Sequence, residues 1–165
     1  MLVYEGSMHV GQLQFRPYVP NTVSPNGLHD PLYWMDFKGH APDLPSQTLA
    51  LFCYHVGQRD DTSARDARYF GRGIGLRLLE ETLGWATSAG FEAVVAKGCP
   101  RFRPVIEYMG GMPTEVYKTK DFEVLAGYRD PDLRAALEDM PLSNALEGVD
   151  LEEAAEVSVC VRMLA

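Results

Sequence analysis

The sequence has no long hydrophobic run, and this shortage excludes an integral membrane protein. The longest apolar stretches, such as Thr48–Tyr54 and Phe91–Ala96, have the length of β-strands, whereas a membrane-spanning helix needs roughly 20 apolar residues. The N-terminus also lacks the cationic start and apolar segment of a secretory signal. We therefore expect a cytoplasmic protein with no membrane partner.

Cysteine is scarce, and its spacing excludes the usual structural metal sites. The three cysteines, Cys53, Cys99 and Cys160, form no C-x-x-C pair, and the histidines are scattered, so we expect no metal. Cys53 and Cys160 lie inside apolar runs, where a buried reduced thiol is the first interpretation. An acyl-accepting role for Cys53 is the alternative.

Positive charge is in deficit, which excludes most nucleic-acid binders. The chain has 15 Lys and Arg against 23 Asp and Glu, a net charge of −8. Such a field repels nucleic acids and anionic membranes. It favours a cationic or neutral substrate, although it can equally serve solubility alone.

The length of 165 residues fits one domain with its own core. We divide it into a hairpin (1–19), a long loop (20–46) with the aromatic cluster Tyr33-Trp34-Met35, a central core (47–128), and an inserted helix with a closing strand (129–165). Apolar patterns and turn residues predict the following elements of the last two parts: strands over Gln47–Val56, Phe91–Lys97, Phe122–Tyr128 and Ala155–Met163, and helices over Leu76–Ala89, Val105–Met109, Pro113–Lys120 and Pro131–Asp139. Gly90 is placed to end the first of these helices, and Asp130 is a candidate N-cap of the last.

The most informative segment is a glycine-rich turn between a strand and a helix, Phe70-Gly-Arg-Gly-Ile-Gly75. Alternate glycines let backbone amides converge on an anion, and the following helix adds its free N–H groups and the positive end of its dipole. A diphosphate is the natural ligand of such a turn. A glycine-rich helix start that binds nothing is the plain alternative.

Two common diphosphate sites do not fit this turn. A nucleoside-triphosphate loop needs Gly-Lys followed by Ser or Thr, and the sequence has no such triplet. The dinucleotide pattern G-x-G-x-x-G fails because Leu76 stands where the third glycine belongs, and because polar residues 57–67 separate the strand from the turn.

The turn resembles motif A, Q/R-x-x-G-x-G/A, of the GCN5-related N-acetyltransferases. Gly73 and Gly75 fit the two glycine positions, with Phe70 in place of Gln or Arg. A second register, starting at Arg68 and using Gly71 and Gly73, also matches, but the first leads into the helix as the family's motif does. A second match lies downstream, where Tyr117-Lys-Thr-Lys-Asp-Phe122 resembles the family's Tyr-x-x-x-Gly-Phe with Asp121 replacing Gly.

The resemblance, which covers about half of the chain, implies an α/β fold with a mixed, mostly antiparallel sheet around a central parallel βαβ unit. It implies an N-acetyltransferase that transfers an acetyl group from acetyl-CoA to a small-molecule or peptide amine. The residues expected to bind the cofactor are Arg68, Phe70, Gly71, Arg72, Gly73, Ile74 and Gly75 at the turn, and the backbone of Tyr54, His55 and Val56, where the family's strands splay apart.

The resemblance also implies that Tyr117 protonates the leaving thiolate, because a phenol is neutral at pH 7. The general base is less defined. His55 is the titratable candidate on its strand, where Cys53 and His55 are expected on one side and Phe52 and Tyr54 on the other. Water, Asp36, Glu107 or Glu115 are alternatives, as are plain packing roles for Tyr117 and His55.

The N-terminal part departs from the family, which usually opens with a strand and helices that wall the acceptor site. Here the sequence starts at the hairpin, so we expect the loop at 20–46 or a second subunit to supply that wall, and the second option predicts a homodimer. A non-catalytic acyl-CoA-binding or regulatory module is the competing function, and a nucleotide-binding module is a weaker one.

Overall fold

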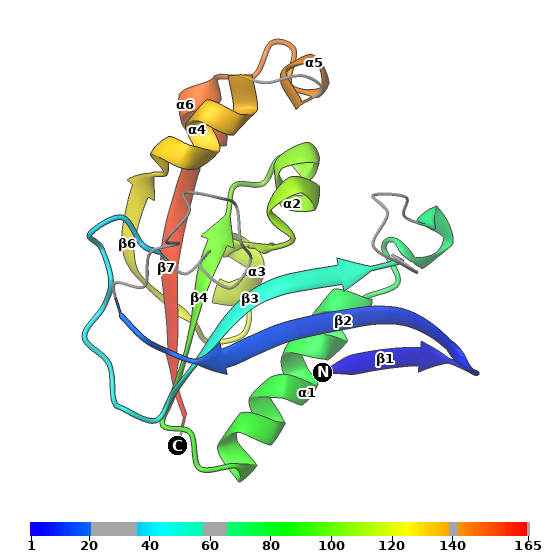
Figure 1. Cartoon of the computed structure of the whole chain (residues 1–165), viewed down its shortest axis with the longest axis vertical. Helices are drawn as coiled ribbons and strands as arrows, with labels where there is room; N and C mark the ends of the chain where they lie inside the picture. Colours follow the sequence, from blue (N-terminus) through cyan, green and yellow to red (C-terminus); the bar gives the residue numbers. More distant parts are fainter. Residues whose placement is uncertain (21–35, 58–65, 139–141, 165) are drawn as a thin grey trace.

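The computed structural model describes residues 1–20, 36–57, 66–138 and 142–164 (Figure 1). The aromatic cluster at residues 33–35 lies outside these residues, so its role as a wall stays a prediction. No helix in the described ranges is long and apolar enough to cross a membrane.

The strands form one mixed sheet, as the sequence predicted. They are β1 (Leu2–Glu5), β2 (Met8–Pro17), β3 (Thr48–Val56), β4 (Ala93–Cys99), β5 (Met112–Pro113), β6 (Glu123–Arg129) and β7 (Glu156–Met163). Their order is β1-β2-β3-β4-β7-β6, with β5 at the end of β4. β4 is parallel to β3 and β5, and the other pairs are antiparallel. The expected closing strand β7 therefore lies between β4 and β6.

Helix α1 (Ile74–Ser88) connects β3 to β4 and completes the βαβ unit. Its buried residues recur at helical spacing, and Gly90 follows it with φ 82°, as predicted for a residue that ends a helix. The other described helices are α2 (Arg103–Met109), α3 (Thr114–Lys118), α4 (Pro131–Glu138), α5 (Leu142–Ala145), α6 (Leu151–Ala154) and the 3₁₀ turn η2 (Ala67–Tyr69). The four-residue helices α5 and α6 were not predicted, because so short a helix leaves no periodic pattern.

Each face of the sheet has its own hydrophobic cluster. On one face, α1 and α3 contribute Leu79 and Tyr117, which pack with Leu49 and Val94 of the sheet. On the other face, Phe37 of the loop and residues of α2, α4 and the α5–α6 segment pack on Val95 and its neighbours in the sheet. The described end of the long loop and the inserted helices thus cover the second face (Figure 1).

A β-bulge in β3 changes which side chains share a face. Gln14 of β2 lies opposite Cys53 and Phe15 lies opposite Leu51, so Phe52 has no partner in the ladder. Phe52 therefore joins Cys53 in the second cluster, whereas Tyr54 belongs to the first. The prediction that Phe52 and Tyr54 share a side is wrong, because strict alternation holds only in an unbulged strand.

A buried ion pair fixes the inserted helices to the sheet. Lys97 Nζ of β4 lies 2.9 Å from Asp130 Oδ2, with both side chains at most 10% exposed. Lys97 also donates to the carbonyl oxygen of Asp36, at 3.0 Å. The second carboxylate oxygen of Asp130 accepts from the amides of Asp132 and Leu133, so Asp130 caps α4 as predicted.

Candidate active site

The two central parallel strands separate at their carboxyl ends. β3 pairs with β4 only from Thr48↔Ala93 to Leu51↔Ala96, and the remainder of β3, Phe52–Val56, has no partner in β4. Figure 1 shows the two arrowheads pointing apart. Since β3 leads toward the glycine turn at the start of α1, the gap and the turn lie at the same end of the βαβ unit.

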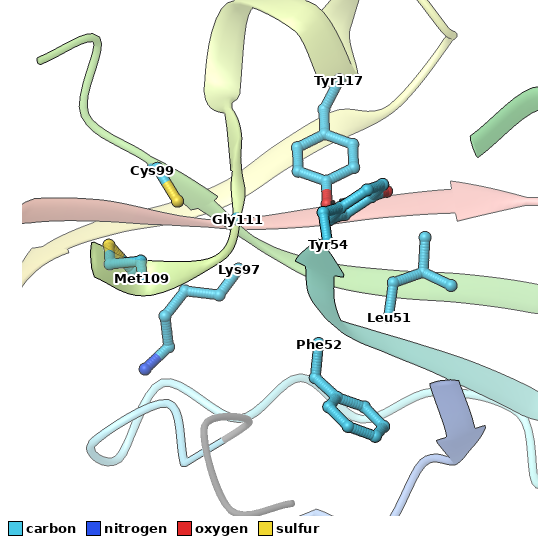
Figure 2. A pocket seen from close by; sticks show the side chains of 8 residues that line it. All are labelled: Leu51, Phe52, Tyr54, Lys97, Cys99, Met109, Gly111 and Tyr117. Atoms are coloured by element: carbon cyan, nitrogen blue, oxygen red, sulfur yellow. Dashed lines mark hydrogen bonds between the residues drawn. The ribbon is translucent and has the colours of Figure 1, made fainter. Parts of the chain in front are cut away.

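A narrow cavity lies in this gap, with a volume of about 10 Å³, which holds about one water molecule. Figure 2 shows Tyr117 and Tyr54 on one side of the cavity, and Phe52 and Lys97 pointing the other way. The further lining residues are Leu51, Cys99, Met109 and Gly111.

Tyr117 of α3 is buried, with 1% of its surface exposed. Its hydroxyl donates to the hydroxyl oxygen of Tyr54 at 3.3 Å. Burial raises the pKa of Tyr117 well above its usual range, and the contact with Tyr54 adds to this. The phenol therefore keeps its proton at neutral pH and can act as a donor.

Asp121 explains how the chain tolerates its departure from the Tyr-x-x-x-Gly-Phe pattern. Its φ is 60°, the left-handed region that favours glycine. Aspartate is among the few other residues that adopt this conformation readily. The amide of Phe122 then bonds back to the carbonyl oxygen of Tyr117, so α3 ends as it would with glycine.

The glycine turn presents unused amides at the N-terminus of α1. Gly71 and Gly73 have φ values of 69° and 74°. Apart from each glycine and its chain neighbours, no atom of the described residues lies within 4 Å of the point where either would carry a Cβ. Among the described residues, no backbone carbonyl accepts a bond from the amides of residues 71–76, whereas the amide of Phe70 bonds to Ala67. α1 begins at Ile74, directly after Gly73 and two residues before the predicted start at Leu76, so Gly75 lies inside the helix.

Several guanidinium groups surround the turn, and two of them were not anticipated from the sequence. Arg68 forms an ion pair with Asp66, with 2.6 Å between Nη2 and Oδ2. Arg72 lies 3.4 Å from Glu5. Arg77, one turn into α1, joins Arg72 in lining a hollow of about 310 Å³ beside Gly73. Arg103 of α2 lies over the ring of Phe70, at 5.1 Å.

The backbone of residues 54–56, which was predicted to bind the cofactor, is partly occupied by a bond within the protein. The amide of Tyr54, which points away from β2 into the gap, donates to the carbonyl oxygen of Gly110 at 2.6 Å. Gly110 directly follows α2 and has φ 57°. The segment after α2 therefore bridges the separated strands at the first of the three predicted positions.

The candidate bases occupy different surroundings. His55 lies in the second half of β3, half-buried, with Nε2 2.9 Å from Cys53 Sγ and Nδ1 3.3 Å from the amide nitrogen of Gln12. Cys53 and His55 thus share a side of the strand, as predicted.

The three carboxylate candidates are engaged in ion pairs. Glu107 pairs with Arg103, and Glu115 pairs with Lys118. Burial opposes the charged form of Asp36, but its hydrogen bonds to Lys38 and the charge of Lys38 outweigh this effect and lower the pKa. Because the three carboxylates are paired with cations, His55 is the best candidate for the general base among the side chains named from the sequence. Within the described ranges, no group of three or more His, Cys, Asp and Glu could hold a metal ion.

Comparison with solved structures identifies proteins of the same fold. An acetyltransferase of the GNAT family from Streptococcus pneumoniae superposes with a TM-score of 0.51 and 14% identity, over 99% of this chain and 65% of that one. The acetyltransferase of Bacillus subtilis in complex with CoA gives a TM-score of 0.57 and 13% identity, over 99% and 75% of the two chains. A GCN5-related N-acetyltransferase from Kribbella flavida gives 0.50 and 14%, over 94% and 61%.

The chain spans about two thirds of the length of these proteins. No protein-family model and no curated protein match its sequence. At these identities the likeness concerns the fold, namely the GNAT arrangement of sheet and helices.

Proposed function

We propose that this chain, which has the GCN5-related N-acetyltransferase fold, transfers an acetyl group from acetyl-CoA to an amine of a small molecule or peptide. The observation that carries the proposal is the row of amides over residues 71–76, which bond to no backbone carbonyl of the described residues. This row lies at the same end of the βαβ unit as the gap between β3 and β4. A diphosphate suits these amides, the dipole of α1 and the nearby Arg72 and Arg77.

The residues present fit coenzyme A at the turn, where added Cβ atoms at Gly71 or Gly73 would enter open space. When bound, coenzyme A supplies the thioester that carries the acyl group. The turn would hold its diphosphate. On the gap side of β3, the backbone of Val56 lies beyond the Gly110 contact, whereas the backbone of His55 faces β2.

Two side chains near the carboxyl end of β3 can handle protons, Tyr117 inside the cavity and His55 outside it. Tyr117 holds a proton at its phenol oxygen, in surroundings that disfavour the phenolate, and can donate it to a leaving group. His55 has a half-buried imidazole on β3 and can accept a proton from an amine.

A non-catalytic acyl-CoA-binding module is the second candidate function. The observation that favours it is the narrow cavity, which has room for about one water molecule. Both functions need coenzyme A binding, and only the transferase needs thiol release that depends on an amine.

A thermal-shift comparison of acetyl-CoA, coenzyme A, ATP and NAD tests the proposed ligand. A ligand at about 100 times its Kd stabilises the folded state by about 2.7 kcal/mol, and we expect this from acetyl-CoA and coenzyme A. Stabilisation by ATP or NAD alone would contradict both functions. A thiol-detecting screen of amines then separates the transferase from the binding module.

The variant Gly73→Ala should lose most of the shift caused by coenzyme A, and Gly90→Ala is its matched control. Both glycines have left-handed φ at opposite ends of α1, with open space around a Cβ. Each substitution therefore costs about 1–2 kcal/mol in backbone strain. Equal coenzyme A shifts in the two variants would show that the turn is not the binding site.

A further inference from the structure

A thiol, an imidazole and an amide form a connected row on β2 and β3. Cys53 Sγ lies 2.9 Å from His55 Nε2, and the other ring nitrogen, Nδ1, lies 3.3 Å from the amide nitrogen of Gln12. Gln12 faces His55 directly across the antiparallel pair, and the bulge at Phe52 immediately precedes Cys53. Backbone pairing thus sets the spacing of all three groups.

This row has the parts of an activated nucleophile. The reactive form of cysteine is the thiolate, an adjacent imidazole can take its proton, and a third group orients the ring. The side-chain amide of Gln12 suits the third role when its oxygen faces Nδ1, an orientation reached by a half-turn of the amide group. The oxygen then accepts from Nδ1–H both before and after Nε2 takes up a proton.

The other two cysteines lack these properties. Burial raises the pKa of Cys99 to about 12 and that of Cys160 to about 11, so both stay protonated at neutral pH. Cys53 also lies against Gly110, where a Cβ would stand 3.1 Å from its sulfur. Gly110 therefore packs closely against the sulfur, in a position where a larger residue would displace it.

We propose that Cys53 is a nucleophile that accepts an acyl group from a thioester, with His55 as its base and Gln12 as the residue that positions the imidazole. This inference rests on the proposed acyl transfer and replaces direct attack by the amine with two successive transfers. In the first step, His55 then removes a proton from the thiol of Cys53 and not from the amine.

The two steps balance without an oxidant or a further reactant. In the first, His55 removes the thiol proton, Sγ bonds to the carbonyl carbon, and the C–S bond of the incoming thioester breaks. The leaving thiolate takes the proton that His55 removed from Cys53. In the second, an amine nitrogen attacks the acyl carbon, the bond to Sγ breaks, and the amine proton returns to Cys53 through His55.

Acylation by p-nitrophenyl acetate tests the thiol in the full chain without coenzyme A. We expect release of nitrophenol with one acetyl group on Cys53, located by mass spectrometry of peptides. His55→Gln should slow this acylation by about 100-fold, and Cys160→Ala should leave it unchanged. Acetylation of Cys99 or Cys160 in preference to Cys53, or no acetylation of any cysteine, would overturn the proposal.

The positioning role of Gln12 has its own test. Gln12→Met should slow the acylation of Cys53, and Gln12→Glu, which keeps an acceptor for Nδ1–H, should restore most of the rate. Gln14→Met, two residues along the same strand, is the control. Circular dichroism and thermal melting confirm that each variant folds. Equal rates in the Met and Glu variants would exclude positioning.

Failure of this inference can be told apart from failure of the proposed function. If Cys53→Ser acetylates amines at the full rate with acetyl-CoA, the transferase stands and the covalent route is wrong. If Cys53 takes up the acetyl group of p-nitrophenyl acetate while no amine is acetylated from acetyl-CoA, the nucleophile stands and the proposed function is wrong.

Discussion

Replacing Tyr117 by Phe should lower turnover with acetyl-CoA and an amine by about 100-fold or more, the usual contribution of a general acid. The change removes the buried hydroxyl that burial keeps protonated and leaves the aromatic ring to pack against Phe122, 4.9 Å away between centroids. Because the ring stays, the KM for acetyl-CoA and the melting temperature should change little. Steady-state kinetics with thiol detection measure the effect.

Tyr54→Phe is the control for this substitution. It removes the hydroxyl that accepts the bond from Tyr117 but leaves the proton donor in place. We expect a smaller loss of turnover than with Tyr117→Phe. If Tyr117→Phe turns over at the wild-type rate, Tyr117 is a packing residue and the leaving thiolate obtains its proton elsewhere.

Replacing Asp130 by Ala should lower the free energy of unfolding by about 3–5 kcal/mol, because it removes the carboxylate that neutralises the buried charge of Lys97. The same change removes the cap of α4, so the helix that covers the second face of the sheet loses its start. Urea denaturation followed by circular dichroism measures the loss.

Asp132→Ala is the matched control, since Asp132 also lies in the first turn of α4 and pairs with Lys38, but its side chain is 62% exposed. An exposed pair contributes at most about 1 kcal/mol. Adding Lys97→Met to Asp130→Ala should recover part of the stability by removing the unpaired charge. Equal losses in Asp130→Ala and Asp132→Ala would mean that the buried pair stabilises no more than the exposed one.

Local patterns in the sequence were sufficient for the longer elements and their order along the chain. α1 follows from helical spacing of Leu79, Leu83 and Ala86, its end from Gly90, and the cap of α4 from Asp130. The glycine turn was recognisable because its chemistry resides in consecutive backbone groups. Each of these features depends on residues that are neighbours along the chain.

The parts that could not be predicted depend on the meeting of distant residues. Lys97 and Asp130 are 33 residues apart, and Gln12 and His55 are 43 apart. The bulge at Phe52 leaves no composition signal, yet it decides which side chains face the gap. Arg103 reaches the glycine turn from a helix whose position relative to Phe70 no local pattern indicates.

The bond between Gly110 and Tyr54 has a consequence for ligand discrimination. An extended ligand that bonds to the amide of Tyr54 must first displace the carbonyl oxygen of Gly110. One hydrogen bond is then exchanged for another, with little net gain in binding free energy. Most of the affinity then resides in the charged diphosphate end of the ligand. Shortened analogues that keep that end should bind nearly as tightly as the whole cofactor.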